Sequence, residues 1–158
     1  MKKAAIFILL VLSASFSYAR IIPYVSPGIT IGYNINNKCL SIIPKLSVGI
    51  ANVEATPHFY SNITFGWNIL TRRTPEFNYP SYTFIELQGG SYMFGGGIGI
   101  AYVKEKGEYR FKRFPKYSLS VGGFLYFNAH IVKTEYGLNH TLGLQAVLPI
   151  PLVYVDLF

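Results

Sequence analysis

The segment Ile63-Thr64-Phe65-Gly66-Trp67-Asn68-Ile69 carries a large apolar side chain at every odd position and a small or polar residue at every even one. Successive side chains of a β-strand point to opposite faces of a sheet, so this pattern predicts a strand with one bulky and one small face. The same alternation occurs in residues 29–35, 46–51, 98–102, 119–122 and 141–146. Its recurrence along the chain predicts an all-β fold.

The composition of the small face indicates which kind of all-β protein this is. Its residues are mostly Gly, Ser, Thr, Asn and Ala, and only 13% of the whole chain is charged. A soluble β-sandwich turns its bulky residues inward and needs a polar or charged outer face. A face of small residues instead suits the narrow inside of a small barrel, with the bulky face turned to lipid. We therefore expect a transmembrane β-barrel, and a soluble secreted barrel is the alternative.

Eight candidate strands can be counted, and bacterial single-chain membrane barrels have an even number. The chain of 158 residues has the length of one domain. We predict an eight-stranded antiparallel up-and-down barrel over residues 20–158. Its expected strands are residues 24–36, 40–53, 58–70, 81–88, 92–103, 117–131, 138–148 and 150–158.

The segments between these strands predict the orientation of the barrel. We expect short periplasmic turns at residues 54–57, 89–91 and 132–137, and longer external loops at residues 71–80 and 104–116. Pro115 falls in the second of these loops, and Pro149 and Pro151 flank a final external turn. Proline cannot donate to a sheet ladder, so its place in predicted turns agrees with this topology.

The first residues have the pattern of an export signal. Lys2 and Lys3 precede an apolar run over residues 4–16, and Ser17 and Ala19 are the small residues of a cleavage site. We predict a secretory signal peptide over residues 1–19, because the run is too short for a transmembrane helix of about 20 residues. The single Cys39 excludes an intramolecular disulfide.

With its signal-like start, alternating strands and apolar end, the chain resembles the small bacterial outer-membrane β-barrel proteins. Residues 152–158 are similar to the barrel-assembly signal of that class, with Leu152, Tyr154 and Phe158 at matching positions and Asp156 departing from the pattern. The resemblance implies a location in the bacterial outer membrane and two partners, the outer-membrane lipid and the barrel-assembly machinery. It selects no subfamily, and the oligomeric state stays open.

The chain is basic, with 14 Lys and Arg against 7 Asp and Glu. Many of the basic residues fall in the two predicted external loops, at the height where lipopolysaccharide carries its phosphates. Contact with those phosphates is one interpretation, and a solvated charged loop is the other. Nucleic acid is not an expected partner of an exported barrel. The candidate contact residues are Arg72, Arg73, Lys104, Lys106, Arg110, Lys112, Arg113 and Lys116.

The sequence predicts no catalytic, metal or cofactor site. His58, His130 and His140 map near expected periplasmic strand ends, where we interpret them as residues at the rim of the barrel. Tyr24, Tyr33, Trp67, Tyr102, Tyr126 and Tyr154 are expected at strand ends or facing outward, as interfacial aromatics. The predicted function is that of a structural or interaction barrel without an open pore, rather than an enzyme. The alternatives are a lipocalin-like carrier of an apolar ligand and, less favoured, a lipid-modifying enzyme.

Overall fold

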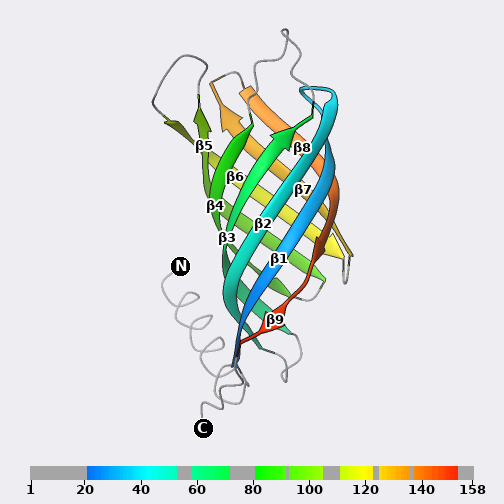
Figure 1. Cartoon of the computed structure of the whole chain (residues 1–158), viewed down its shortest axis with the longest axis vertical. Helices are drawn as coiled ribbons and strands as arrows, with labels where there is room; N and C mark the ends of the chain where they lie inside the picture. The colour runs from blue at the N-terminus through cyan, green and yellow to red at the C-terminus, as the bar shows by residue number, and fades with distance from the viewer. Residues whose placement is uncertain are drawn as a thin grey trace, which may run out of the picture.

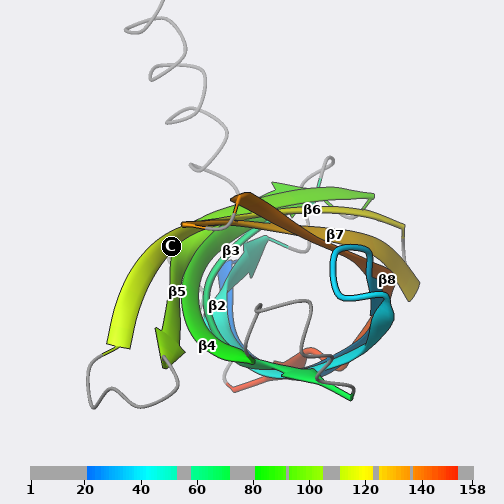
Figure 2. The ribbon, with the colours of Figure 1, turned by 90° about the horizontal axis from the view of Figure 1, so that it is seen from above.

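The computed structural model describes residues 21–52, 58–71, 81–91, 93–104, 111–122, 125–135 and 137–152. These residues form an eight-stranded antiparallel β-barrel whose strands are tilted against its long axis (Figure 1). From β1 to β8 each strand pairs with its sequence neighbours, and β1 also pairs with β8, which closes the ring (Figure 2). The strands are β1 (Ile21–Asn34), β2 (Cys39–Asn52), β3 (Phe59–Leu70), β4 (Tyr82–Ser91), β5 (Phe94–Lys104), β6 (Phe111–Gly122), β7 (Leu125–Thr134), β8 (Gly137–Val147) and β9 (Ile150–Pro151).

The short strand β9 continues β8 along the same edge of β1. β8 pairs with β1 up to Gly28, and β9 pairs with Tyr24 and Val25 in the same register. The ladder is interrupted between them at Pro149, which has no N–H to donate. A separate eighth strand over residues 150–158 is therefore the wrong assignment for residues 150 and 151, and residues 153–158 lie outside the described part.

The predicted strand over residues 117–131 is in fact two strands. β6 ends at Gly122, whose backbone has a φ of 150°, and the chain returns as β7 from Leu125. β6 also begins earlier than expected, so residues 111–116 of the predicted loop 104–116 belong to a strand. Pro115 lies in this strand and not in a turn, directly beyond Lys116, where the β6–β7 ladder ends.

The two ends of the barrel hold different turns. At the hairpin end, the upper end in Figure 1, residues 35–38 join β1 to β2. The turn between β7 and β8 lies there too, since the Ile35 N–H donates to the His140 carbonyl at 2.9 Å. The prediction that residues 132–137 form a turn at the periplasmic end, where β1 begins, is therefore wrong. The opposite end, where β1 begins, is the chamber end. Pro149 and Pro151 were predicted to flank an external turn, but this segment runs along β1 toward the chamber end.

The strand β4 extends further than predicted. Gly89, Gly90 and Ser91 were predicted as a turn, but all three pair with β3 as part of β4. The reversal comes just after them, between Ser91 and Met93. The strand is longer than its alternation suggested because glycine on a strand shows no bulky face to reveal its parity.

The inside-out arrangement of side chains that the alternation predicts is confirmed. Ile31, Val48, Phe65, Ile100 and Leu144 are all exposed, by 41–52%. The alternate positions point into the barrel and are buried although most are polar; they include Thr30, Ser47, Thr64, Asn128 and Thr141. The barrel therefore has an apolar outer face and a polar interior over the described strands.

Candidate functional site: the barrel interior

The half of the interior next to the hairpin end is filled by side chains. Asn34 donates to Asn139 at 2.7 Å and to Thr141 at 2.9 Å, which ties β1 to β8 there. Further in, buried apolar side chains form a cluster inside the barrel. Its members come from four strands and are Ile43, Tyr82, Phe84, Ala101, Val103 and Val132.

A buried ion pair lies at the middle of the barrel, next to this cluster. Lys116 Nζ lies 2.6 Å from a carboxylate oxygen of Glu86, and both side chains are fully buried. Gln88 donates to the same carboxylate at 3.1 Å, and the Ser118 hydroxyl donates to its other oxygen. β5 makes room for this group with Gly97, where a Cβ atom would meet the Glu86 carboxylate. Multiple hydrogen bonds of this kind are what a buried carboxylate requires.

Two more basic side chains are buried near the same level. Lys45 on β2 is 7% exposed, and His130 on β7 is 1% exposed and packs against the Phe84 ring. Neither the Lys45 Nζ nor either His130 ring nitrogen has a hydrogen-bond partner among the described residues. The interior therefore contains more basic than acidic groups at its middle.

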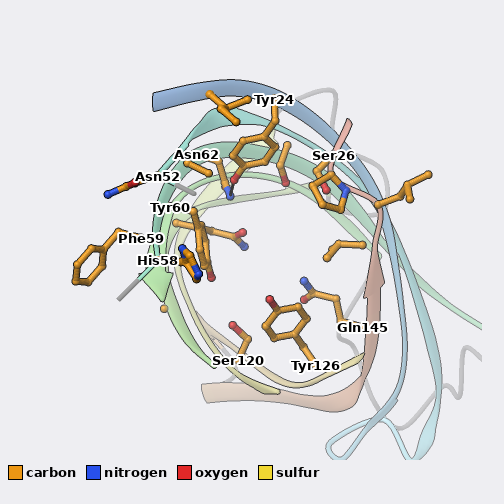
Figure 3. Close-up of a pocket in the computed structure, with 18 of the residues that line it drawn as sticks. Tyr24, Ser26, Asn52, His58, Phe59, Tyr60, Asn62, Ser120, Tyr126 and Gln145 are labelled. Atoms are coloured by element: carbon orange, nitrogen blue, oxygen red, sulfur yellow. Dashed lines mark hydrogen bonds between the residues drawn. The ribbon is translucent and has the colours of Figure 1, made fainter. Parts of the chain in front are cut away.

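The other half of the interior is open and forms a chamber of about 690 Å³ at the chamber end. Figure 3 shows four side chains that point into this chamber, those of Tyr24, Tyr60, Tyr126 and Gln145. The Phe59 side chain points away from it. Its polar wall residues are Tyr24, Ser26, Ser47, Asn52, Tyr60, Asn62, Gln88, Ser118, Ser120, Tyr126, Asn128 and Gln145. Ile22, Val147, Leu148, Pro149 and Pro151 form an apolar part of the wall.

Hydrogen bonds hold the polar wall of the chamber in place. Asn62 donates to the Tyr24 hydroxyl at 2.9 Å and accepts from Thr64 at 2.8 Å. Asn128 donates to Gln145 at 2.6 Å, across the β7–β8 ladder. The Asn128 carbonyl oxygen is buried and has no donor among the described residues. The amide groups of Asn62 and Asn128 and the Tyr24 phenol are therefore held in place within the wall.

The structure removes one residue from the predicted phosphate-contact set. Lys116 was expected in an external loop, but it lies buried inside the barrel and is paired with Glu86. Lys104 and Arg113 are exposed near the hairpin end, and Arg113 lies 6.0 Å from the Tyr102 ring. Lys112 is partly exposed there and pairs with Glu135 at 3.1 Å. Arg72, Arg73, Lys106 and Arg110 lie outside the described residues.

The other sequence predictions have mixed outcomes. Leu152 is 55% exposed, whereas Tyr154, Phe158 and the predicted signal peptide lie outside the described part. His58 is exposed and lines the mouth of the chamber, but the rim position expected for His130 is wrong, because it is buried in the middle. His140 lies at the hairpin end and not at the expected one. Among the described residues, no group of His, Cys, Asp or Glu has the arrangement of a metal site.

The chamber was not predicted from the sequence. Tyr24 and Tyr126 were interpreted as interfacial aromatics, but both line the chamber. Strand parity was the available signal, since Tyr24, Ser26 and Thr30 share one face of β1 and Ile29 and Ile31 share the other.

None of the described residues forms a helix long and apolar enough to cross a membrane. The chain matches no protein-family profile, no curated protein and no solved structure.

Proposed function

We propose that this protein is an integral β-barrel of the bacterial outer membrane, exported by residues 1–19 and acting as a structural or interaction protein without an open pore. The observation that carries the proposal is the outer face of the barrel. Large apolar side chains on every strand from β1 to β8 are about half exposed, among them Ile31, Leu46, Phe65 and Leu144. Soluble monomers rarely expose continuous apolar surface of this extent, whereas lipid would cover it.

Closure of the ring supports the same proposal. A sheet edge cannot be satisfied in hydrocarbon, and the pairing of β1 with β8 leaves no open edge there. The buried cluster around Tyr82 and Val103 and the Lys116–Glu86 pair fill one half of the interior. Side chains packed in this part of the interior support an anchoring or binding role over that of a channel.

The basic residues at the hairpin end support contact with lipopolysaccharide. Lys104 and Arg113 are exposed where β5 and β6 meet the connecting loop, and Lys112 lies beside them. Guanidinium and ammonium groups bind phosphate oxygens with charge-assisted hydrogen bonds. In this proposal the hairpin end faces outward and the chamber end faces the periplasm.

The lipocalin-like alternative is less favoured by the outer face, because a soluble carrier would have to expose the same large apolar side chains to water.

The test is a pair of matched arginine substitutions on β2. Leu46 lies at the middle of the strand and Leu40 near its hairpin end, and both are 45% exposed. In lipid vesicles, Leu46→Arg is expected to lower the free energy of unfolding by about 2–4 kcal/mol and Leu40→Arg by about 0–1 kcal/mol, because lipid penalises the charge by depth. Denaturant titration of the folded proteins measures both values.

A barrel in water gives a different result in the same experiment. Exposed surface substitutions there change stability by about 0.5 kcal/mol or less, whatever their height on the barrel. Equal small effects of Leu46→Arg and Leu40→Arg, together with a wild type that stays soluble without detergent, would overturn the membrane proposal.

A further inference from the structure

The chamber has the size and the position of a ligand pocket. Its volume of about 690 Å³ falls in the range of small-molecule sites. His58 is exposed at its mouth, and the buried pair of Lys116 and Glu86 lies deeper in the barrel. A molecule that enters from the chamber end would therefore leave bulk water and be surrounded by the strands.

The polar groups deep in the wall bond to protein groups and offer little to a ligand. Wall residues take part in four hydrogen bonds of 2.6–3.1 Å, which join Ser47 with Thr64, Asn62 with Tyr24, Gln88 with Glu86 and Asn128 with Gln145. The Asn128 carbonyl oxygen has no donor among the described residues, but it is itself buried, so a ligand does not reach it. A strongly polar ligand would have to break such bonds to gain bonds of its own.

The side chains that present surface to the chamber are mainly aromatic and aliphatic. Tyr60 and Tyr126 are partly exposed, and both point into the chamber (Figure 3). Ala51 and Val147 are also partly exposed, and each lies on the inward-facing side of its strand. A ligand would therefore touch rings and methyl groups, and burial of apolar surface against them favours an apolar ligand.

The width of the barrel and the chemistry of the mouth limit the ligand further. The interior of an eight-stranded barrel has room only for side chains or one small ligand, so a narrow, unbranched molecule fits better than a broad one. His58 is exposed at the mouth, and the described residues that line the chamber include no Asp or Glu to repel an acidic group. An acidic head group can therefore stay in water at the mouth and bond to the imidazole.

We propose that the chamber binds a fatty acid, with the unbranched hydrocarbon chain inside and the carboxylate at the mouth beside His58. The chain lies against the rings of Tyr60 and Tyr126. It also contacts the methyl groups of Ala51 and Val147. The proposal concerns the interior of the barrel and does not depend on what surrounds its outer face. Failure of the membrane test would therefore leave it standing, with the titration below done in buffer, and failure of the titration would leave the membrane proposal standing.

The experiment is a titration of the folded protein with dodecanoate, in nanodiscs of deuterated lipid, followed by NOEs from the chain protons to protein methyl groups. We expect the NOEs to Ala51 and Val147 to saturate. The outward-facing methyl groups of Val121 and Leu144 are the internal control, because contact there reports fatty acid dissolved in the lipid and should rise without saturation. Dodecanedioate, with a carboxylate at each end, should bind at least tenfold more weakly, because one charge would have to enter the chamber.

Two variants and a control locate the site. Ala51→Phe should raise the dissociation constant of dodecanoate at least tenfold, because the added ring takes the space of the chain. Ala146→Phe, near the same end but facing outward, should leave it unchanged. His58→Gln should raise the dissociation constant of dodecanoate severalfold and leave that of dodecanol unchanged. The folded state of each variant is checked by its NMR spectrum.

Four results would overturn the proposal. They are the absence of saturable NOEs to Ala51 and Val147, equal binding of dodecanedioate, unchanged binding by the folded Ala51→Phe variant, or an unchanged affinity of His58→Gln for dodecanoate.

Discussion

At the scale of single residues, the least expected feature is a lysine and a glutamate sharing the middle of the barrel. Lys116 stands among basic residues in the sequence, which suggested a solvated loop. The alternation of β6 continues through it, however, with Ser118 and Ser120 inward and Tyr117 and Leu119 outward. The polar face of the strand thus extends one step further than the bulky residues alone indicated, and parity assigns Lys116 to the interior.

Breaking this pair should destabilise the fold strongly. Lys116→Met leaves the Glu86 carboxylate buried without its cation, and we expect the free energy of unfolding to fall by about 3–5 kcal/mol. The matched control is Lys112→Met, which removes the partner of Glu135 at the partly exposed pair and should cost about 0–1 kcal/mol. Denaturant titration compares the two, and the double variant Glu86→Gln/Lys116→Met should recover much of the loss. Similar losses for the two lysines would argue against a buried role for Lys116.

At the scale of strands, the alternation of side chains located strand segments correctly, whereas the turn between β6 and β7 was not predicted. The strand segments containing Ile31, Val48 and Phe65 were located from sequence because each shows several bulky residues in period two. The β6–β7 reversal was missed because apolar residues stand on both sides of it. Gly122-Gly123 was the available turn signal within the predicted strand over residues 117–131. That one omission moved the β7–β8 turn to the wrong end.

The reversal depends on the conformation of Gly122. Its φ of 150° is one that other residues rarely adopt, and a Cβ atom there would meet the Leu125 carbonyl oxygen. We expect Gly122→Ala to lower the free energy of unfolding by about 1–3 kcal/mol. Gly96→Ala is the control, because a Cβ at Gly96 would lie 3.6 Å from its nearest neighbour. If denaturant titration gives equal values for both variants, Gly122 has no special role in the turn.

At the scale of the whole molecule, the two ends of the barrel have different chemistry. The hairpin end has exposed basic groups, including Lys104 and Arg113, and the chamber end has neutral polar groups and apolar ones. The barrel and its basic end could be predicted from the sequence. The chamber could not, because the register of all eight strands decides which small and polar side chains face one another across the barrel.

The proposed outward orientation predicts how the basic end binds lipopolysaccharide. The double variant Lys104→Gln/Arg113→Gln should bind it roughly 30-fold more weakly, at about 1 kcal/mol per charge. Lys38→Gln, at the same end on the β1–β2 turn, is the single-charge control and should change binding much less. Binding is measured by titration of the detergent-solubilised protein. An equal loss with dephosphorylated lipopolysaccharide would contradict recognition of phosphate.

The interruption before Pro149 has a consequence for how the molecule is made. β1 leaves the ribosome before the other described strands. It pairs with β2 on one side and with β8 and β9 on the other, and β8 and β9 are made much later. The seam between β1 and these two strands is thus the most distant contact in the sequence, and its ladder contains a gap. Contacts that join distant parts of a chain form slowly. Pairing of β1 with β8 and β9 should therefore limit the rate of assembly. Until then the first strand keeps one bare edge, which is open to capture by a helper protein or by another nascent copy.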